Sequence, residues 1–359
     1  MRKKRLSSLE FTSVSRRNLR TIVVTTLVMM VIGIAYTGIV STFNWHSLIV
    51  GAAVGCILGL VGTPAELYWF TRVSRSVPFT AVLAIRTTFY VLLVHVAIFG
   101  VHGYHMSLMY GIPFTETFAR PEFRNYLGSL EMVRDFVFIL AVVFMSNFIR
   151  EINRLLGQNA LMSFITGKYF KPIEEQRIFM FVDLKDSTAI AEKLGHQQYH
   201  AFLNDFVHDI TPGIIESRGE IYQYVGDEVV ITWTAPNGLR EANCVRCFFR
   251  IAASLHLREP VYRKKYGFIP GFKAGYHYGP VIAGEIGDVK KEIVFHGDTV
   301  NTAARIRSEC TRLRKDLLLS GDLLSRIAID DILTPEMIGK IKLRGKEEEV
   351  ELFTIAEAA

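Results

Sequence analysis

An uncharged, strongly apolar stretch from Thr21 to Thr42 constrains this chain more than any other feature of its sequence. It is long enough for the roughly 20 residues that an α-helix needs to cross a bilayer. A cleaved signal peptide would have a shorter apolar core and a clear small-residue cleavage site. We therefore predict a membrane-spanning helix here. Three further apolar runs predict three more such helices, over Leu48–Phe70, Phe79–Gly103 and Met132–Ile149.

Composition agrees with a membrane protein. Half of the 359 residues are apolar, the mean hydropathy is +0.25 and only 21% of residues are charged. The net charge of +6 could indicate nucleic-acid binding, but the basic residues flank the apolar runs. That distribution is typical of membrane topology. We expect a lipid bilayer as a partner and no nucleic acid.

The basic residues also predict an orientation. Lys and Arg are concentrated in the N-terminal arm and at two later places, Arg72 with Arg75 and Arg150 with Arg154. The positive-inside rule then puts both termini in the cytoplasm and predicts a multi-pass protein of the inner (plasma) membrane. Arg120 and Arg124 fall on the outer side, and the fourth apolar run is the shortest, so the fourth helix has the weakest support.

Two groups of residues in the apolar half leave alternatives open. Gly51, Gly55 and Gly59 share one helix face, so they predict close packing of two helices, either within the chain or between two protomers. Histidines gather toward the outer ends of the second and third runs, where they are either haem or metal ligands or hydrated interfacial side chains: His46, His95, His102 and His105.

Beyond residue 150 the sequence becomes typical of a soluble domain. We predict a basic cytosolic arm over 1–20, a transmembrane domain over 21–150, a linker helix over 151–176 and a soluble domain over 177–359. In the soluble domain a short strand ends at Asp183, and a helix could be capped at Asp186-Ser187-Thr188. A strand-turn-strand around Gly226, a helix near 244–257 and a glycine-rich strand pair over 271–287 follow. This β-α-β-β-α-β order predicts an α+β ferredoxin-like fold.

That topology would bring two carboxylates together. The first strand lies beside the middle hairpin, so Asp183 at its end and Asp227 at the hairpin tip should converge. Two carboxylates without a basic partner repel each other unless divalent cations hold them. Two metal ions on such a pair can activate an attacking oxygen and neutralise phosphate charge. Unrelated turn acids are the alternative that spacing alone leaves open.

Four motifs in order resemble the class III adenylate and guanylate cyclase catalytic domain over about 177–355. They are "FVDLKDST", "GEIYQYVGDE", "FHGDTVNTAARI" and "KLRGKEEEVELF". The apolar half resembles the anchor of some bacterial membrane cyclases more weakly.

The resemblance implies a set of site residues and a reaction. Asp183 and Asp227 match the two metal-binding aspartates, and the backbone carbonyl of Leu184 would add a ligand. Asn301 and Arg305 match the pair that orients the ribose and stabilises the pentavalent phosphorane, and Lys346 matches the lysine that binds terminal phosphates. The implied enzyme is a homodimer with shared active sites and two Mg²⁺ or Mn²⁺ ions per site. It would convert ATP to 3′,5′-cyclic AMP and pyrophosphate.

The base-selecting positions depart from the family pattern. Adenylate cyclases commonly have lysine and an aspartate or threonine there, guanylate cyclases have glutamate and cysteine, and this chain has Gln223 and Val294. The Gln223 amide can donate or accept a hydrogen bond, whereas Val294 can do neither. Because no carboxylate is present for the guanine N1 and N2 protons, we expect ATP. The alternatives are a guanylate or mixed-substrate cyclase, a nucleotide-binding membrane sensor without turnover, and, more weakly, a transporter.

Overall fold

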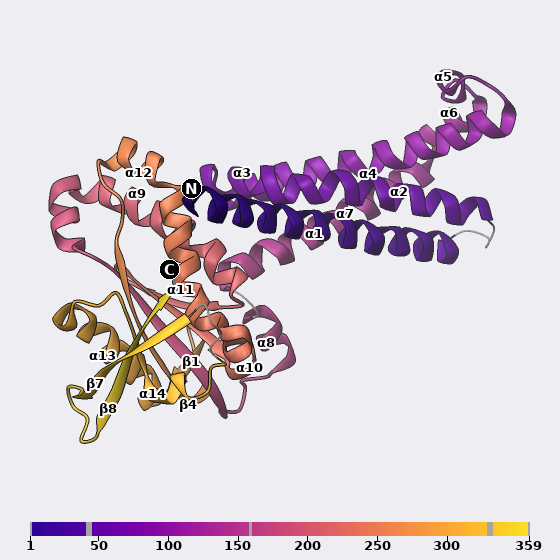
Figure 1. Cartoon of the computed structure of the whole chain (residues 1–359). Coiled ribbons are helices and arrows are strands. Elements are labelled where there is room, and N and C mark those ends of the chain that lie inside the picture. The colour runs from indigo at the N-terminus through magenta and orange to yellow at the C-terminus, as the bar shows by residue number, and fades with distance from the viewer. Residues whose placement is uncertain (1, 41–44, 158–159, 329–332, 358–359) are drawn as a thin grey trace. The chain divides into compact units, whose positions relative to one another are not determined.

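The computed structural model describes residues 2–40, 45–157, 160–328 and 333–357 of the chain (Figure 1). It separates into two compact units, Met1–Leu155 and Leu156–Ala359. The first is entirely helical over its described residues: α1 Arg2–Val40, α2 Trp45–Pro64, the π-helix η1 Ala65–Phe70, α3 Thr71–Ser76, α4 Phe79–Tyr110, α5 Phe114–Thr117, α6 Pro121–Leu127 and α7 Leu130–Leu156.

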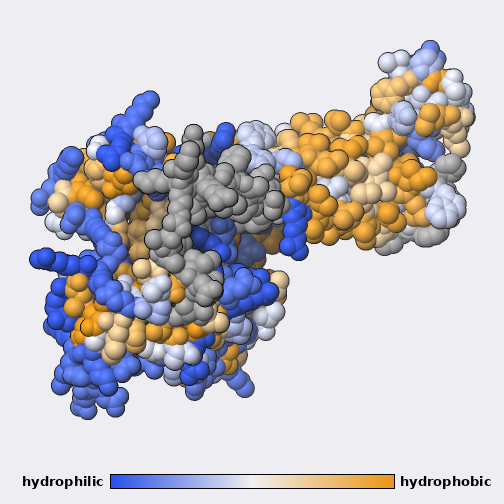
Figure 2. Space-filling view, viewed as in Figure 1, coloured by the Kyte–Doolittle hydropathy of each residue, from blue (hydrophilic) through white to orange (hydrophobic). Residues whose placement is uncertain are grey.

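Four segments of this helical unit are long and apolar enough to cross a membrane: Asn18–Gly38, Ser47–Ser74, Phe79–Tyr110 and Met132–Leu156. They correspond to the four predicted runs, and the fourth is longer than its sequence suggested. Large apolar side chains on them are exposed, among them Val31, Val96 and Val137. Figure 2 shows hydrophobic residues covering most of the visible surface of these helices. Such a surface is suited to lipid contact.

The glycines of α2 pack against α1 within the same chain. A Cβ on Gly51 would lie 2.4 Å from the carbonyl oxygen of Gly33, and one on Gly55 would lie 2.2 Å from that of Met29. A Cβ on Gly59 would meet Thr26. Of the two alternatives for this glycine face, the structure therefore supports packing within the chain, because small residues let two membrane helices approach closely.

Arg86 joins three helical segments of this unit through ion pairs. Its guanidinium lies 3.4 Å from Glu66 of η1 and 3.1 Å from Glu151 of α7, and both Arg86 and Glu151 are buried. Glu66 also pairs with Arg150 at 2.7 Å and accepts a hydrogen bond from Tyr90 at 2.9 Å. A buried charge is tolerated when it is paired, and both terminal nitrogens of Arg86 form ion pairs, while its buried Nε has no hydrogen-bond partner.

The second unit is an eight-stranded sheet with helices. Its helices are α8 Ala160–Thr166, α9 Ser187–Glu216, α10 Ala235–Leu239, the 3₁₀ helix η2 Arg240–Ala242, α11 Asn243–Leu257, α12 Glu259–Tyr266, α13 Asp298–Leu313 and α14 Gly321–Leu324. Its strands are β1 Ile173–Leu184, β2 Glu220–Val225, β3 Glu228–Thr234, β4 Phe272–Ile286, β5 Glu292–His296, β6 Leu317–Ser320, β7 Leu333–Lys342 and β8 Glu349–Glu357.

The sheet contains the predicted ferredoxin-like core. Its strand order is β2-β3-β1-β4-β6-β8-β7, with β5 paired to β4. Each neighbouring pair among the first four strands is antiparallel, and β1 lies between β3 and β4. Together with α9 and α11 they make the β-α-β-β-α-β unit expected from the sequence. The strands from β6 onward extend this core on one side, and β6 runs parallel to β4.

Alternation along β1 divides the core between the two faces of the sheet. Ile178, Met180 and Val182 pack into the main cluster with residues of α9 and α11. Phe179 and Phe181 belong to the cluster on the other face, with Ala303 of α13. Because successive strand side chains point to opposite faces, Asp183 continues the Phe179–Phe181 row and faces α13.

Two local predictions were wrong. The glycine-rich segment is one strand of 15 residues, β4, that pairs with β1 along its length, rather than a strand pair. Two of its glycines, Gly275 and Gly279, allow a close approach to Arg307 and Thr299 of α13. Asp186 occupies the N-cap position of α9, but its backbone is left-handed, with φ of 54°, and its side chain makes no capping hydrogen bond. The first strand also begins at Ile173, earlier than the Arg177 start expected from the motif.

Candidate active site

Asp183 lies beside the β2–β3 hairpin, as the topology predicts. In the antiparallel pairing of β1 with β3, Asp183 is directly opposite Glu228. Asp227 immediately precedes Glu228 in the hairpin turn, where Gly226 has a φ of +64° that favours glycine. Three carboxylates, from Asp183, Asp227 and Glu228, therefore gather at one end of the sheet.

Two basic side chains form ion pairs with two of these three carboxylates, Asp183 and Glu228. Lys273 is opposite Asp183 on β4, and its Nζ lies 3.0 Å from Asp183 Oδ2. Arg307 of α13 reaches the same oxygen with Nη1 at 3.4 Å and forms an ion pair with Glu228 through Nη2. The side chains of Asp183 and Glu228 are 13% and 11% exposed, so these ion pairs are largely shielded from water.

The packing of α13 on β4 fixes the place from which Arg307 extends. A Cβ on Gly275 would lie 2.1 Å from the backbone nitrogen of Arg307 and 2.5 Å from its Cα. Only glycine at position 275 allows the helix to approach this closely. Since Gly275 is two residues beyond Lys273 on the same face of β4, the helix sets Arg307 directly over the row of charged residues.

Burial dominates the electrostatics of the hairpin acid Glu228. Desolvation raises the pKa of Glu228, the Arg307 guanidinium opposes this, and Asp183 adds to it. The pKa of the Tyr199 phenol on α9 is also raised, first by burial and then by the negative charge of Asp227, with a smaller contribution from Asp183. Tyr199 thus lies within electrostatic range of both aspartates.

The donor set suits a hard divalent cation. Mg²⁺ and Mn²⁺ prefer oxygen ligands, and Asp183 and Asp227 supply carboxylate oxygens from adjacent strands. The hydrocarbon side chain of Leu184 has no donor atom, so this residue can offer only its backbone carbonyl. Over the described residues, no group of three or more His, Cys, Asp or Glu side chains forms a metal cage, and this includes the histidines of α4. A metal held by two aspartates therefore needs further ligands from a bound substrate or from water.

The other predicted catalytic residues lie on a different face of α13. Arg305 and Arg307 are two residues apart, or about 200° around the helix axis, so they point in opposite directions. Arg305 Nη2 lies 3.5 Å from the position of a Cβ on Gly345, and Asn301, one turn before Arg305, is exposed. The structure brings Asn301 and Arg305 together on one face, and it shows no contact between them and Asp183.

Lys346 is on the Arg305 side of the helix. Its Nζ forms an ion pair at 2.7 Å with Asp298, the first residue of α13. This lysine lowers the pKa of Asp298, and Arg305 contributes to the same effect, although burial opposes it. Arg305, Lys346 and Asp298 therefore form a second charged group, separate from the one around Asp183.

Gln223 on β2 and Val294 on β5 lie on strands that do not pair with each other, since β2 pairs with β3 and β5 with β4. Gln223 follows an irregularity in β2 and is exposed, while Val294 on β5 is half-buried. Their sequence neighbours Tyr222 and Phe295 pack with ring centroids 5.0 Å apart, and the Phe295 amide donates to the Tyr222 hydroxyl at 3.4 Å. Gln223 and Val294 themselves share no hydrogen bond in the structure.

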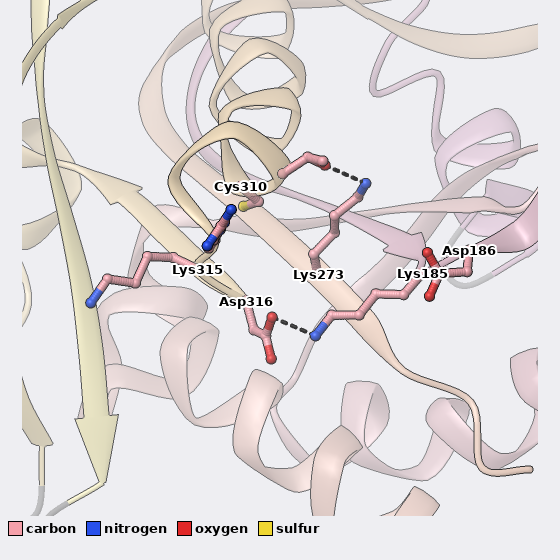
Figure 3. A pocket seen from close by; sticks show the side chains of 8 residues that line it. Lys185, Asp186, Lys273, Cys310, Lys315 and Asp316 are labelled. Carbon is pink, nitrogen blue, oxygen red and sulfur yellow. Dashed lines mark hydrogen bonds and ion pairs between the residues drawn. The ribbon is translucent and has the colours of Figure 1, made fainter.

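A pocket of about 320 Å³ adjoins the acidic group through Lys273 (Figure 3). In Figure 3 the Lys273 ammonium donates to Thr311 at 2.8 Å, and Lys185 pairs with Asp316 at 2.5 Å. More basic than acidic side chains line this pocket, which suits a polyanion. The lining residues are Lys185, Asp186, Lys273, Cys310, Thr311, Arg314, Lys315 and Asp316.

Three residues of this site, Glu228, Lys273 and Arg307, were not predicted from the sequence. Glu228 had a signal, because it follows Asp227 directly and alternation places it opposite Asp183. No motif in the sequence indicated a role for Arg307. Its role depends on the rotation of α13 and on the close approach at Gly275, which only the packed structure gives.

Comparisons with known proteins agree with the motifs. Residues 171–357 match the family described as adenylate and guanylate cyclase catalytic domain. The chain is 34% identical over 208 residues to adenylate cyclase 2 of Rhizobium meliloti (strain 1021), covering 58% of this chain and 57% of that protein. It is 29% identical over 187 residues to a receptor-type guanylate cyclase of Caenorhabditis elegans, covering 50% of this chain and 17% of that protein.

One solved structure, that of a bacterial light-regulated adenylyl cyclase, aligns with a TM-score of 0.52 at 20% identity. The alignment covers 64% of this chain and 66% of that one. At this identity the similarity supports the fold alone. This chain spans a little over half the length of the Rhizobium relative and under a fifth of the length of the Caenorhabditis relative.

Proposed function

Because this chain belongs to the adenylate and guanylate cyclase catalytic domain family, we propose that it is a membrane-anchored adenylate cyclase. The proposed reaction converts ATP to 3′,5′-cyclic AMP and pyrophosphate. The ribose 3′-oxygen forms a bond to the α-phosphorus, the bond from that phosphorus to the bridging oxygen of the β-phosphate breaks, and the 3′-hydroxyl proton is lost to solvent. Pyrophosphate leaves with the bonding electrons.

One observation carries this proposal: the gathering of Asp183, Asp227 and Glu228 beside a pocket lined with basic side chains. Asp183 and Asp227 would hold two Mg²⁺ or Mn²⁺ ions, with the Leu184 carbonyl as a further ligand. When bound, such ions lower the pKa of the attacking hydroxyl and neutralise phosphate charge. Lys273, which pairs with Asp183, and Lys185, which lines the same pocket as Lys273, would hold the polyphosphate of the nucleotide.

The opposed faces of α13 support a homodimer with shared sites. Arg307 contacts Asp183 within the chain, so Asn301 and Arg305 point away from that aspartate and toward another partner. A second copy related by a two-fold axis would supply Asn301, Arg305 and Lys346 to the Asp183 site, and each dimer would then contain two equal sites. There Asn301 would orient the ribose, and the guanidinium of Arg305 would balance the charge that develops on the phosphoryl group.

ATP is the proposed substrate because the base-selecting positions lack a carboxylate. Guanine presents two N–H donors that a glutamate accepts, whereas Gln223 offers an amide and Val294 an apolar side chain. The relatives include both adenylate and guanylate cyclases, so base selection rests on these two residues. A guanylate or mixed-substrate cyclase is the second candidate, and a sensor without turnover is the third.

The four long apolar helices support an anchor in the inner (plasma) membrane, with the catalytic domain in the cytoplasm. An assay of the purified full-length chain in detergent, with Mn²⁺ and with ATP and GTP in separate reactions, tests the proposal. We expect cyclic AMP as the main product. Cyclic GMP as the main product would make the chain a guanylate cyclase, and the absence of either product from a folded dimer would support the sensor.

A further inference from the structure

The charged residues beneath α13 form a row across three adjacent strands. Glu228 on β3, Asp183 on β1 and Lys273 on β4 are direct cross-strand neighbours, so their side chains share one face of the sheet. Arg307 comes to this row from the helix above and bridges the two acids, Asp183 and Glu228. In this structure its guanidinium therefore occupies a position between two carboxylates that a divalent cation could also occupy.

The bridging position of Arg307 is fixed by the fold. The backbone of Arg307 rests on Gly275 at distances that a side chain on residue 275 would prevent. The side chain is only 25% exposed, and its bridge spans two strands. A guanidinium with several donors in a planar fork can bind two carboxylates at once, which a compact ammonium cannot do with the same geometry.

We infer that Arg307 is a positioning residue of the metal site, which holds Asp183 and Glu228 together before metal binds and must release Asp183 when a divalent cation enters. Glu228 then retains the guanidinium, so it serves as the anchor of Arg307 and not as a ligand. Arg307 thus lowers the metal affinity of the nucleotide-free protein. The inference rests on the proposed assignment of Asp183 and Asp227 as metal ligands.

Competition between Arg307 and the metal follows from charge and contact. The same carboxylate oxygen, Asp183 Oδ2, forms ion pairs with both Arg307 and Lys273. A cation within a few ångströms of a divalent ion disfavours the ion, and this repulsion is strongest where water is excluded. Removing the Arg307 charge should therefore tighten metal binding while loosening the metal-free site.

The test is a Mn²⁺ titration of the purified full-length chain in detergent, without nucleotide, in which electron paramagnetic resonance measures free Mn²⁺. We expect Arg307→Met to bind Mn²⁺ about tenfold more tightly than the unmodified chain. Arg307→Lys keeps the positive charge but lacks the planar guanidinium that bridges two carboxylates, so it should tighten Mn²⁺ binding less than Arg307→Met does. Arg312→Met is the matched control, because Arg312 is an exposed arginine of the same helix that pairs with Glu309, and its affinity should not change.

Thermal melts separate this role from a purely structural one. Without metal, Arg307→Met should melt below the unmodified chain, and saturating Mn²⁺ should raise its melting temperature by more than that of the unmodified chain. If Arg307 had only a structural role, Arg307→Met would lower the melting temperature by the same amount with and without Mn²⁺. If Arg307→Met does not fold, the same measurements are made on Arg307→Lys. An unchanged Mn²⁺ affinity in the variants that fold would overturn the inference.

A further arm distinguishes this inference from the proposed function. Asp183→Asn should abolish the Mn²⁺ binding that the titration detects. If Asp183→Asn binds Mn²⁺ as well as the unmodified chain, the assignment of the metal site itself is wrong. If Asp183→Asn loses binding but Arg307→Met leaves the affinity unchanged, the metal site stands and only the role of Arg307 fails.

Discussion

Arg305 and Arg307 are two residues apart on α13, yet they belong to different charged groups. Arg307 contacts Asp183 at 3.4 Å and pairs with Glu228, whereas Arg305 lies beside Gly345 and near Asp298. Helix geometry imposes this separation, since two positions correspond to about 200° of rotation. Arg307 of α13 therefore faces the acidic group of its own chain, whereas Arg305 of the same helix faces a different surface.

This separation predicts complementation between two inactive variants. Asp183→Ala and Arg305→Ala should each abolish cyclase activity alone, because each removes one part of every site in the proposed homodimer. When they are co-expressed, about half of the dimers are mixed, and each mixed dimer keeps one intact site. We expect about a quarter of the unmodified activity, measured as cyclic AMP formation. An inactive mixture, with mixed dimers verified by pull-down, would place the whole site within one chain.

The two aspartates should be essential for turnover but not for the fold. Asp183→Ala or Asp227→Ala removes a proposed metal ligand, so activity should disappear at saturating Mn²⁺ while the chain remains a folded dimer. Asp205→Ala is the control, since it removes a surface carboxylate that pairs with Lys265 at 2.6 Å. Cyclic AMP assays and size-exclusion chromatography check both expectations. Full activity in either aspartate variant would exclude the two-metal assignment.

Gln223→Glu should raise the ratio of GTP to ATP turnover. A carboxylate at position 223 accepts from the guanine N1 and N2 protons and repels the lone pair of adenine N1. A hydrogen-bond change of this kind is worth roughly 1–3 kcal/mol when the group is buried by the bound nucleotide. Parallel assays give the ratio, and Glu220→Gln at the other end of β2 serves as a control. An unchanged ratio would mean that residue 223 does not contact the base.

His277 should make the cyclase unit sensitive to acid. This β4 histidine is buried, and its Nδ1 lies 2.7 Å from Ser320 Oγ. Burial lowers the pKa of His277 from 6.5 to about 4. The unfolded chain therefore takes up the proton first as pH falls below 6.5, and stability is lost progressively toward pH 4. Between pH 7 and pH 5 the free energy of unfolding should fall by about 2 kcal/mol from this group.

The measurement for His277 uses Trp233, which is buried in the core of the same unit. Thermal melts followed by its fluorescence, in a chain with Trp45→Phe and Trp69→Phe, report on this unit alone. His277→Gln should flatten the decline of melting temperature between pH 7 and pH 5. An equally steep decline in that variant would show that other groups cause the acid sensitivity.

Arg86→Met should destabilise the helical unit strongly. It removes one of the two ion-pair partners of Glu151, whose side chain is 1% exposed and which then keeps only Arg154 at 2.5 Å, and it also removes a partner of Glu66. Breaking one side of a buried ion pair typically costs about 3–5 kcal/mol. Arg134→Met is the matched control, because its pair with Asp135 is exposed and is worth about 0–1 kcal/mol. Melting in detergent, followed by Trp69 fluorescence, should separate the two variants clearly.

Replacing Glu151 as well should recover part of this loss. In the double variant with Arg86→Met and Glu151→Gln, the buried carboxylate that would keep only Arg154 as its partner is gone. Similar melting temperatures for Arg86→Met and Arg134→Met would contradict a stabilising role for the Arg86 ion pairs.

Local sequence was sufficient for the order and type of the main elements. The apolar runs predicted four long apolar helices, because length and a low content of charge are properties of the segment itself. The β-α-β-β-α-β order predicted that β1 lies beside the hairpin, which placed Asp183 opposite Glu228. The sequence did not predict that Phe272–Ile286 forms one strand, β4. Whether a glycine in such a segment forms a turn or makes room for a packed helix depends on what packs against the strand.

Sequence alone thus determined the apolar helices, the ferredoxin-like core and the convergence of the Asp183 strand with the Asp227 turn, since these follow from periodicity and strand order. Tertiary structure decided which charges meet there. The approach of α13 to Gly275 sets the rotation of the helix, and this rotation turns Arg307 toward Asp183 and Arg305 away from it. Such contacts depend on fractions of a helical turn and on distances of a few ångströms between distant segments, which a one-dimensional pattern does not encode.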